Sequence, residues 1–284
     1  MKLIKQSFKI IEQPSGLEGM YKQIELVGRC CAKSEDKITE DSSKEFVDRM
    51  IKLWHGAVLE HGTVYLEFHV KDPSIVGEEE YHNQQGFLNK LINKYVGNKY
   101  SIVKVNHYYD TAFITTNYRV LVENNWLDDL KYLCEPTEFH EKRVCVKFIL
   151  PIGISREFCR HRVFSFMEMS TRYVNMSGNK VGNEITFIEP NFKDASTRLT
   201  WRLSMTNAEA DYNNLIKAGC KPQEARDVLP LATKTELYMT GFISDWKHFF
   251  ELRSNKYGRG GAHPQANELA TPLYEEFVNR GYIK

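Results

Sequence analysis

The stretch from residue 143 to residue 150 constrains the fold more than any other part of the chain. Its apolar side chains alternate with others, so that one face carries Val144, Val146, Phe148 and Leu150. A period of two residues predicts a β-strand, because successive side chains of a strand point to opposite faces of its sheet. A chain with such a strand has to pair it in a sheet and cover its apolar face.

Other segments extend this pattern into a fold class. Three further strands are predicted, at residues 63–70, 113–122 and 184–189. Helices are predicted at residues 41–53, between Pro222 and Pro230, at residues 234–253, and in the tail from Pro264. Another is predicted where apolar residues at helical spacing, from Ala208 to Ile216, end at Gly219. Strands in the front part and helices in the back part indicate an α+β fold, with a central antiparallel sheet flanked by helices.

Composition limits the domain organisation. With 42% hydrophobic and 26% charged residues, the chain is typical of a globular protein and not of a disordered one. Its 284 residues fit one large domain or two small ones. No linker rich in glycine and serine marks a boundary, so we expect a single domain over residues 1–284. Residues 71–142 are polar and weakly patterned, and we expect them to elaborate the sheet.

Charge and hydropathy limit the partners. A net charge of +1 argues against nucleic acid as a partner, because dedicated nucleic-acid binders carry a basic excess. The N-terminus lacks the apolar core of a signal peptide, and no apolar run approaches the roughly 20 residues that span a bilayer. We therefore expect no membrane partner and a cytoplasmic location. The six cysteines form no CxxC pair and no zinc-like spacing, which predicts reduced thiols and no metal.

The most informative segment for chemistry runs from residue 156 to residue 173. Within it stand four arginines and a histidine, with hydroxyl residues among them and Glu168 in the middle: Arg156, Arg160, His161, Arg162, Arg172, Ser165, Ser170, Thr171 and Glu168. An arginine fork can hold a phosphate at two points, and neighbouring hydroxyls add neutral donors. The segment predicts a phosphate cradle that runs from a helix end into a loop. The same residues also fit an arginine-rich surface turn paired with acids, or a small nucleic-acid patch.

A resemblance to a known family narrows these alternatives. The run Arg160-His161-Arg162, followed after seven residues by Ser170, resembles the RHR-x7-S signature of flavin-dependent thymidylate synthases, and the longer pattern RHRxxSxxExSxRY also fits. Residues 55–61 resemble the family's HGxxxEH stretch, residues 224–231 its ARxxLP helix, and residues 250–253 its late arginine. The likeness covers roughly residues 27–70 and 144–277, and it leaves residues 71–142 as an insertion that compact members lack.

The resemblance implies an activity and its cofactors. Members of this family methylate dUMP at C5 to give dTMP, with methylenetetrahydrofolate as carbon donor and NADPH as reductant through FAD. They are homotetramers whose active sites form between subunits, and their fold is α+β. The protein is thus expected to be a methyltransferase and flavoprotein of dTMP biosynthesis.

The resemblance also implies roles for single residues. FAD is expected to be held by Arg160, His161 and Arg162, with His55, Ala57 and His248 beside the flavin. The dUMP phosphate is expected at Ser170 and Arg172 and at the backbone of Met169 and Thr171, with Arg160 also reaching the nucleotide and Glu168 near both ligands. Phe242 and Ser244 depart from the Asn and Arg of some members, which leaves the adenosine side of FAD open.

Three more residues complete the expected substrate site. Arg226 resembles a second arginine on dUMP. Arg253 resembles the arginine at the uracil edge, where a guanidinium would stabilise negative charge on the ring, and it is our candidate catalytic residue. Glu157 stands where some relatives carry glutamine near the nucleotide. Each has a plainer alternative: Glu168 as an ion-pair partner of the arginines, Arg226 as a helix-flank salt bridge, and His55 as a structural histidine.

Competing classes of protein remain open. An enzyme that uses a cysteine nucleophile would have to use Cys159, which lies inside the arginine cluster, where neighbouring cations could lower its pKa. A non-catalytic nucleotide or RNA binder could reuse the cradle. A flavoprotein oxidase that has lost methyl transfer would keep the flavin residues but would not need Arg226 and Arg253.

Overall fold

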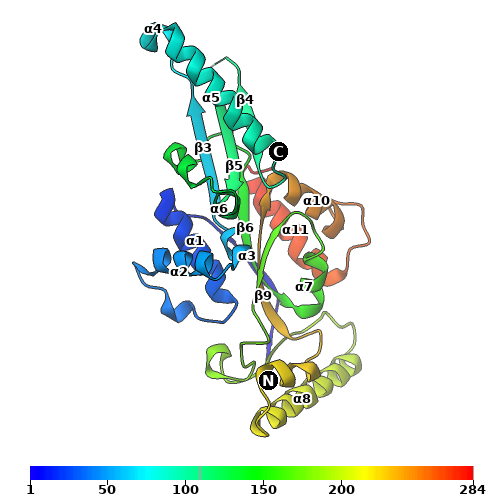
Figure 1. Ribbon diagram of the computed structural model, residues 1–284. Helices are drawn as coiled ribbons and strands as arrows, with labels where there is room; N and C mark the ends of the chain where they lie inside the picture. The colour runs from blue at the N-terminus through cyan, green and yellow to red at the C-terminus, as the bar shows by residue number, and fades with distance from the viewer. Residues whose placement is uncertain (109, 284) are drawn as a thin grey trace.

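The computed structural model describes residues 1–108 and 110–283, and it shows a molecule in three tiers (Figure 1). The middle tier holds a four-stranded antiparallel sheet with the strand order β2-β6-β9-β7. Its strands are β2 (Ser7–Ile11), β6 (Arg143–Pro151), β9 (Lys234–Phe242) and β7 (Ser165–Glu168). The predicted strand at residues 143–150 is therefore confirmed, as is the α+β fold with an antiparallel sheet.

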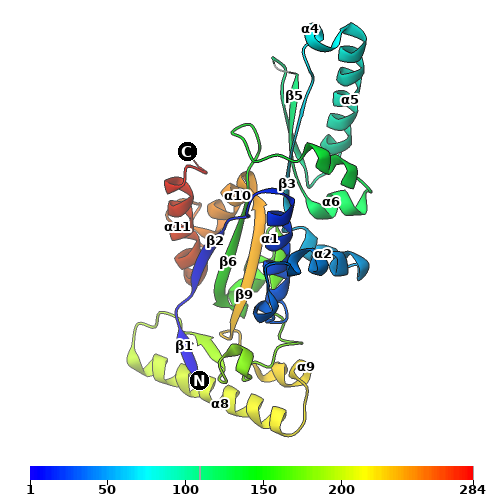
Figure 2. The same ribbon diagram turned by 90° about the vertical axis from the view of Figure 1, so that its left-hand side faces the viewer.

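One face of the central sheet forms the main hydrophobic core. Val146 pairs with Met239 and Phe148 with Leu237 in the β6–β9 register, and all four side chains are fully buried. The helices α7 (Ile152–Phe158), α10 (Ile243–Arg253) and α11 (Pro264–Asn279) cover this face (Figure 2). The alternation seen in β6 thus faces a helical layer, as the sequence predicted.

The opposite face of the sheet packs against the N-terminal helices. These are α1 (Gly16–Cys30), α2 (Ser42–Lys52) and the single turn α3 (Gly56–Leu59). Cys145 of β6 and Tyr238 of β9 are buried on this side, next to Val27 and Cys30 of α1. The helix predicted at residues 41–53 is confirmed as α2.

The prediction of a helix over residues 234–253 is wrong for its first nine residues, which form β9, and correct for α10. Both faces of β9 are covered, so almost every residue in it is buried and no alternation marks it as a strand. Gly241 allows the close packing at its end, since a Cβ there would lie 2.5 Å from the ring of Phe164. A strand buried on both sides cannot be told from a buried helix by periodicity.

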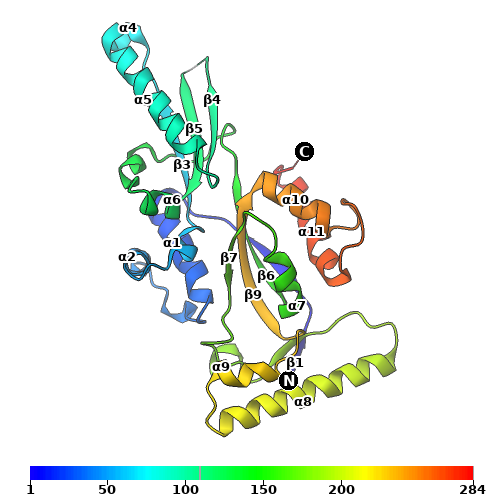
Figure 3. The same ribbon diagram turned by 45° about the vertical axis from the view of Figure 1, so that its right-hand side comes forward.

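The upper tier is an arm, which we define as residues 63–134 (Figure 3). Its separate antiparallel sheet has the order β3-β5-β4, with β3 (Thr63–His69), β5 (Thr111–Asn117) and β4 (Ile102–Asn106), and it packs against α5 (Glu78–Val96), which follows the turn α4 (Pro73–Val76). The strand predicted at residues 63–70 is confirmed. It pairs within the arm, so residues 71–142 build on β3 and not on the central sheet.

The strand predicted at residues 113–122 is only half correct. The chain leaves β5 at Asn117, whose side chain accepts a hydrogen bond of 3.2 Å from the backbone N–H of Val120 and so caps helix α6 (Tyr118–Glu123). An asparagine cap offers the backbone an alternative to the strand ladder. The valines and leucine that follow continue as a buried helix.

The lower tier carries the remaining helices. Strand β8 (Thr186–Ile188) lies within the predicted residues 184–189, but it pairs in parallel with β1 (Lys2–Ile4) and not with the central sheet. Below them run α8 (Ala195–Lys217) and α9 (Pro222–Ala225). Gly219, with a φ of 94°, follows α8 as expected for a glycine after a helix end. Nowhere in the described ranges does a helix have the length and apolarity needed to cross a bilayer.

Candidate active site

The segment expected to form one phosphate cradle is divided in two by strand β7. Arg160, His161 and Arg162 lie in the turn between α7 and β7, whereas Ser170, Thr171 and Arg172 lie in the loop after β7. A four-residue strand spans roughly 13 Å, so the two turns sit at opposite ends of an edge strand. The sequence therefore placed the right residue types on loops but missed the strand between them.

The arginines of these turns are exposed and have no acidic partner among the described residues. The side chains of Arg160, Arg162 and Arg172 face solvent, and none of them forms an ion pair with a described residue. This observation disfavours the alternative of a surface turn paired with acids. Exposed guanidinium groups without carboxylate partners keep their donors for an external anion.

Arg253 is held in a defined position close to the first turn. Its Nη1 lies 2.6 Å from Oε2 of Glu157, its Nη2 donates to the backbone oxygen of Glu157 at 3.0 Å, and its Nε donates to Nε2 of His161 at 2.9 Å. The structure thus brings together Glu157 on α7, His161 on the turn and Arg253 at the end of α10. The carboxylate of Glu157 faces the guanidinium of Arg253.

His161 accepts the hydrogen bond from Arg253 as a neutral imidazole. Burial, together with the smaller effects of the nearby charges of Arg253 and His248, lowers its pKa to about 4. Its ring packs edge-on against Phe249, with the centroids 5.0 Å apart, and lies 6.3 Å from the ring of His248. Because Nε2 accepts from Arg253, the ring proton must be on Nδ1.

Glu168 at the end of β7 has a neutral partner. The hydroxyl of Ser155 donates to its Oε1 at 2.6 Å. Burial raises the pKa of the Glu168 carboxyl, and the bond from Ser155 opposes that shift. The plainer alternative of a salt bridge to an arginine is not seen among the described residues. Ser155, on α7, is a site residue that the sequence analysis missed, since only the fold brings it to Glu168.

Cys159 does not have the properties of a nucleophile. Burial, with a further contribution from Glu168, raises the pKa of its thiol to about 11. The arginines beside it in sequence point away to solvent and do not lower that pKa. The thiol therefore stays protonated at neutral pH, which argues against a cysteine-based mechanism.

The loop after β7 is anchored by its backbone. Ser170 N–H donates to the oxygen of Cys31 at 2.9 Å, and Met169 N–H donates to the oxygen of Glu236 at 2.9 Å. The donor of Met169, expected for the dUMP phosphate, is therefore already used. The hydroxyl of Ser170 accepts from the N–H of Arg172 at 3.2 Å, and the N–H of Thr171 has no partner within the described chain.

A cluster of charges lies under this loop. Three amines surround the buried carboxylate of Glu236, those of Lys33 at 3.1 Å, Lys147 at 2.6 Å, and Lys234. Burial alone would raise the pKa of Glu236, but Lys234 and Lys147 bring it down to about 2. The thiol of Cys30 also lies close to this carboxylate, and burial raises its pKa to about 12. No sequence pattern indicated this cluster.

The other expected residues lie on separate elements. His55 and Ala57 are exposed at the start of α3, and His248 is exposed on α10, 3.7 Å from a carboxylate oxygen of Glu251. Arg226 is exposed after α9, with only a 4.0 Å contact to Asp227. Its neighbour Ala225 is buried in the same hydrophobic cluster as Met169.

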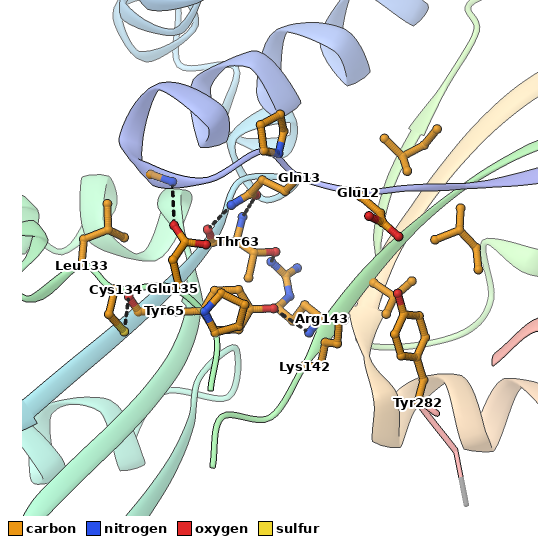
Figure 4. Close-up of a pocket in the computed structure, with 16 residues that line it drawn as sticks. Glu12, Gln13, Thr63, Tyr65, Leu133, Cys134, Glu135, Lys142, Arg143 and Tyr282 are labelled. Carbon is orange, nitrogen blue, oxygen red and sulfur yellow. Dashed lines mark hydrogen bonds between the residues drawn. The ribbon is translucent and has the colours of Figure 1, made fainter. Parts of the chain in front are cut away.

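Two cavities differ in their position relative to the expected site residues. One of about 250 Å³ adjoins Glu157 and is lined by Gly153, Leu231, His263 and Gln265, among others. The other, of about 240 Å³, lies where the arm meets the central sheet, between Gln13, Tyr65, Arg143 and Tyr282 (Figure 4). No residue of the second cavity belongs to the expected site.

These features define a class of protein: an α+β chain with exposed, uncommitted arginines on turns at an edge strand, suited to bind phosphorylated ligands. Comparison with known families narrows the class. Residues 126–280 match the sequence model of the family described as thymidylate synthase complementing protein. That match covers more than half of the chain, and the chain belongs to this family.

Individual relatives agree with the assignment. The chain is 29% identical over 137 residues to a probable flavin-dependent thymidylate synthase of Paramecium bursaria Chlorella virus 1, a match that covers 44% of this chain and 62% of that protein. It is 30% identical over 132 residues to the flavin-dependent thymidylate synthase of Pyrococcus furiosus, covering 46% of this chain and 52% of the relative. The chain thus spans between half and two thirds of the length of these relatives.

Among solved structures, the chain is similar to a UMP/dUMP methylase PolB from Streptomyces cacaoi bound with 5-Br UMP. The TM-score is 0.47 at 13% identity, with 98% of this chain and 92% of the other covered.

Proposed function

We propose that the protein is a flavin-dependent thymidylate synthase, which methylates dUMP to dTMP with methylenetetrahydrofolate as carbon donor and NADPH as reductant through FAD. The observation that carries the proposal is the set of exposed arginines at both ends of β7, free of acidic partners, in a chain of this family. A cofactor with a pyrophosphate and a substrate with a phosphate both need such donors.

The turn before β7 suits the cofactor. Arg160 and Arg162 would hold the phosphates of FAD, and neutral His161 would face the cofactor with His248 beside it. His55 and Ala57, both exposed on α3, would lie along the flavin. Bound FAD would supply hydride transfer between NADPH and the one-carbon unit, while the chain binds and orients the reactants.

The loop after β7 suits the substrate. The hydroxyl of Ser170, the N–H of Thr171 and the guanidinium of Arg172 converge on one short loop, and Arg226 follows from the neighbouring helix. These groups would hold the phosphate of dUMP. The charge cluster around Glu236 fixes the loop from below through the backbone at Met169.

Arg253 would act on the pyrimidine ring. A guanidinium at the uracil edge stabilises negative charge that develops as C5 becomes nucleophilic, and this stabilisation is strong where water is excluded. Arg253 is suited to this role because it is mostly buried, with 17% of its side chain exposed, and already oriented. Glu168 would lie between the two ligands, with Ser155 setting its orientation.

We also propose a homotetramer in which active sites form between subunits. The two arginine turns of one chain are separated by the length of β7, so a single phosphate group cannot contact both of them, and a second copy would supply further groups to each ligand. The protein would act as a single catalytic domain with residues 71–142 as an insertion, and its cytoplasmic location stays a prediction.

One assay tests the function. The purified protein is incubated with dUMP, methylenetetrahydrofolate, NADPH and FAD, and dTMP is measured by chromatography. We expect dTMP only when all four are present, and NADPH oxidation that accelerates when dUMP is added. NADPH oxidation that does not depend on dUMP, with no dTMP, would instead identify a flavoprotein oxidase that has lost methyl transfer.

A further inference from the structure

The guanidinium of Arg253 has an unusually complete set of protein partners for a residue at a ligand site. Three of its five N–H groups are engaged, one by a carboxylate oxygen, one by a backbone oxygen and one by an imidazole nitrogen. Two of these three acceptors belong to the same residue, Glu157. Two N–H groups remain for a ligand.

The contacts with Glu157 tie two helices together. Glu157 is near the end of α7 and Arg253 is the last residue of α10, 96 positions further along the chain. The ion pair between the two side chains would by itself allow both side chains to move together relative to the helix backbones. The second bond, from Nη2 to the backbone oxygen of Glu157 at 3.0 Å, fixes the guanidinium relative to the α7 backbone itself.

We infer that Glu157 is a positioning residue that holds Arg253 in its working orientation, and that it does not bind the nucleotide itself; this rests on the proposed role of Arg253 at the uracil ring. The Glu157 carboxylate already faces a cation at 2.6 Å, with 33% of its side chain exposed. A carboxylate turned toward a nucleotide phosphate would be repelled, whereas one turned toward Arg253 is stabilised.

Preorganisation explains why such a tie would matter. A long arginine side chain samples many rotamers, and fixing it before the ligand arrives removes that cost from binding and catalysis. Glu157 supplies an anionic acceptor and a carbonyl acceptor, and neutral His161 supplies the third. Together these acceptors leave one N–H group on Nη1 and one on Nη2 for a ligand.

The test uses three variants of the holoenzyme. Glu157→Ala removes the carboxylate, and Glu157→Gln keeps an acceptor of the same shape without the charge. Glu276→Ala is a matched control, because Glu276 on α11 forms an equally short 2.6 Å ion pair with Arg280, just after that helix and outside the site. We measure kcat and KM for dUMP, flavin content and thermal stability for each.

A positioning role predicts a particular pattern. Glu157→Ala lowers kcat by about 30- to 100-fold, with KM for dUMP within about threefold of the parent value and normal flavin content. Glu157→Gln recovers most of the loss, to within about fivefold of the parent kcat. In an Arg253→Ala background, Glu157→Ala causes no further loss, since both changes remove the same interaction.

A readout without turnover separates this inference from the proposed function. The crystal structure of the Glu157→Ala protein is expected to show the Arg253 side chain displaced from His161 or in several conformers, whether or not the protein forms dTMP. If Arg253 stays in place, the inference is wrong. It is also wrong if Glu157→Gln raises KM for dUMP more than tenfold at unchanged kcat, because that pattern identifies a nucleotide-binding residue. Absence of dTMP from the parent protein would contradict only the proposed function.

Discussion

Substitution of Arg253 is the change whose effect follows most directly from the structure. Arg253→Ala removes a guanidinium with two N–H groups left for a ligand, the other three being bound to Glu157 and His161. A hydrogen bond to a charged group contributes about 1.5–3 kcal/mol. Two such bonds would supply about 3–6 kcal/mol, and the negative charge of Glu157 beside the guanidinium favours the lower half of that range.

We therefore expect Arg253→Ala to lower kcat for dTMP formation by about 10² to 10³, which corresponds to about 2.7–4 kcal/mol. Arg253→Lys keeps the charge but loses the planar fork, and a single ammonium cannot satisfy His161, Glu157 and a ligand together. We expect it to lose about tenfold or more in kcat.

The assay combines dTMP formation at saturating dUMP with the flavin absorbance of the purified variants. Flavin content should stay near normal in Arg253→Ala, because the His161 ring keeps its packing against Phe249. The reasoning is refuted if the alanine variant retains more than a tenth of the parent kcat. A variant that loses its flavin would move Arg253 into the cofactor site.

Three further predictions concern the surroundings of the site. Trp246→Ala should destabilise the protein by about 3–5 kcal/mol in urea unfolding, because the side chain is fully buried and its indole N–H bonds the oxygen of Val144; a cost below about 1 kcal/mol would show that α10 does not depend on this packing. Cys159→Ser should retain turnover, and its inactivity would restore the thiol mechanism. The depressed pKa of His161, about 4, means that the unfolded chain binds a proton in the range from about pH 6.5 down to about 4 while the folded one does not. The free energy of unfolding should therefore decrease as the pH is lowered from about 6.5 to about 4, by up to about 1.4 kcal/mol per pH unit. His161→Asn should reduce this dependence on pH in a series of urea unfolding measurements.

The parts of the fold that could be predicted are those with one exposed and one buried side. Strand β6 shows its alternation, Gly219 marks the end of α8, and Pro222 and Pro264 mark the starts of α9 and α11, although α9 ends at Ala225 and not near Pro230. Strand β9 could not be predicted, because burial on both faces removes the alternation of apolar and polar side chains that marks a strand. The end of β5 was missed because one asparagine cap decides where the strand stops.

The residue types of the site could be predicted, but their contacts could not. An arginine-rich segment with hydroxyls indicates phosphate binding from chemistry alone, and the family pattern assigns roles. The partners of Arg253 and Glu168 come from elements far away in sequence or from the opposite end of a strand, so only the fold brings them together. Strand β7 is too short to show a periodicity, so the sequence predicts one cradle where the structure has two turns.

The central claim is that the two arginine turns flanking β7 bind a flavin dinucleotide and a pyrimidine monophosphate. A crystal structure of the protein with FAD and dUMP tests it most directly. We predict the FAD phosphates at Arg160 and Arg162, the dUMP phosphate at Ser170 and Arg172, and the uracil ring within hydrogen-bond distance of Arg253. The claim is contradicted if both turns are empty while the ligands bind elsewhere, or if the arginines pair with acids of a neighbouring subunit.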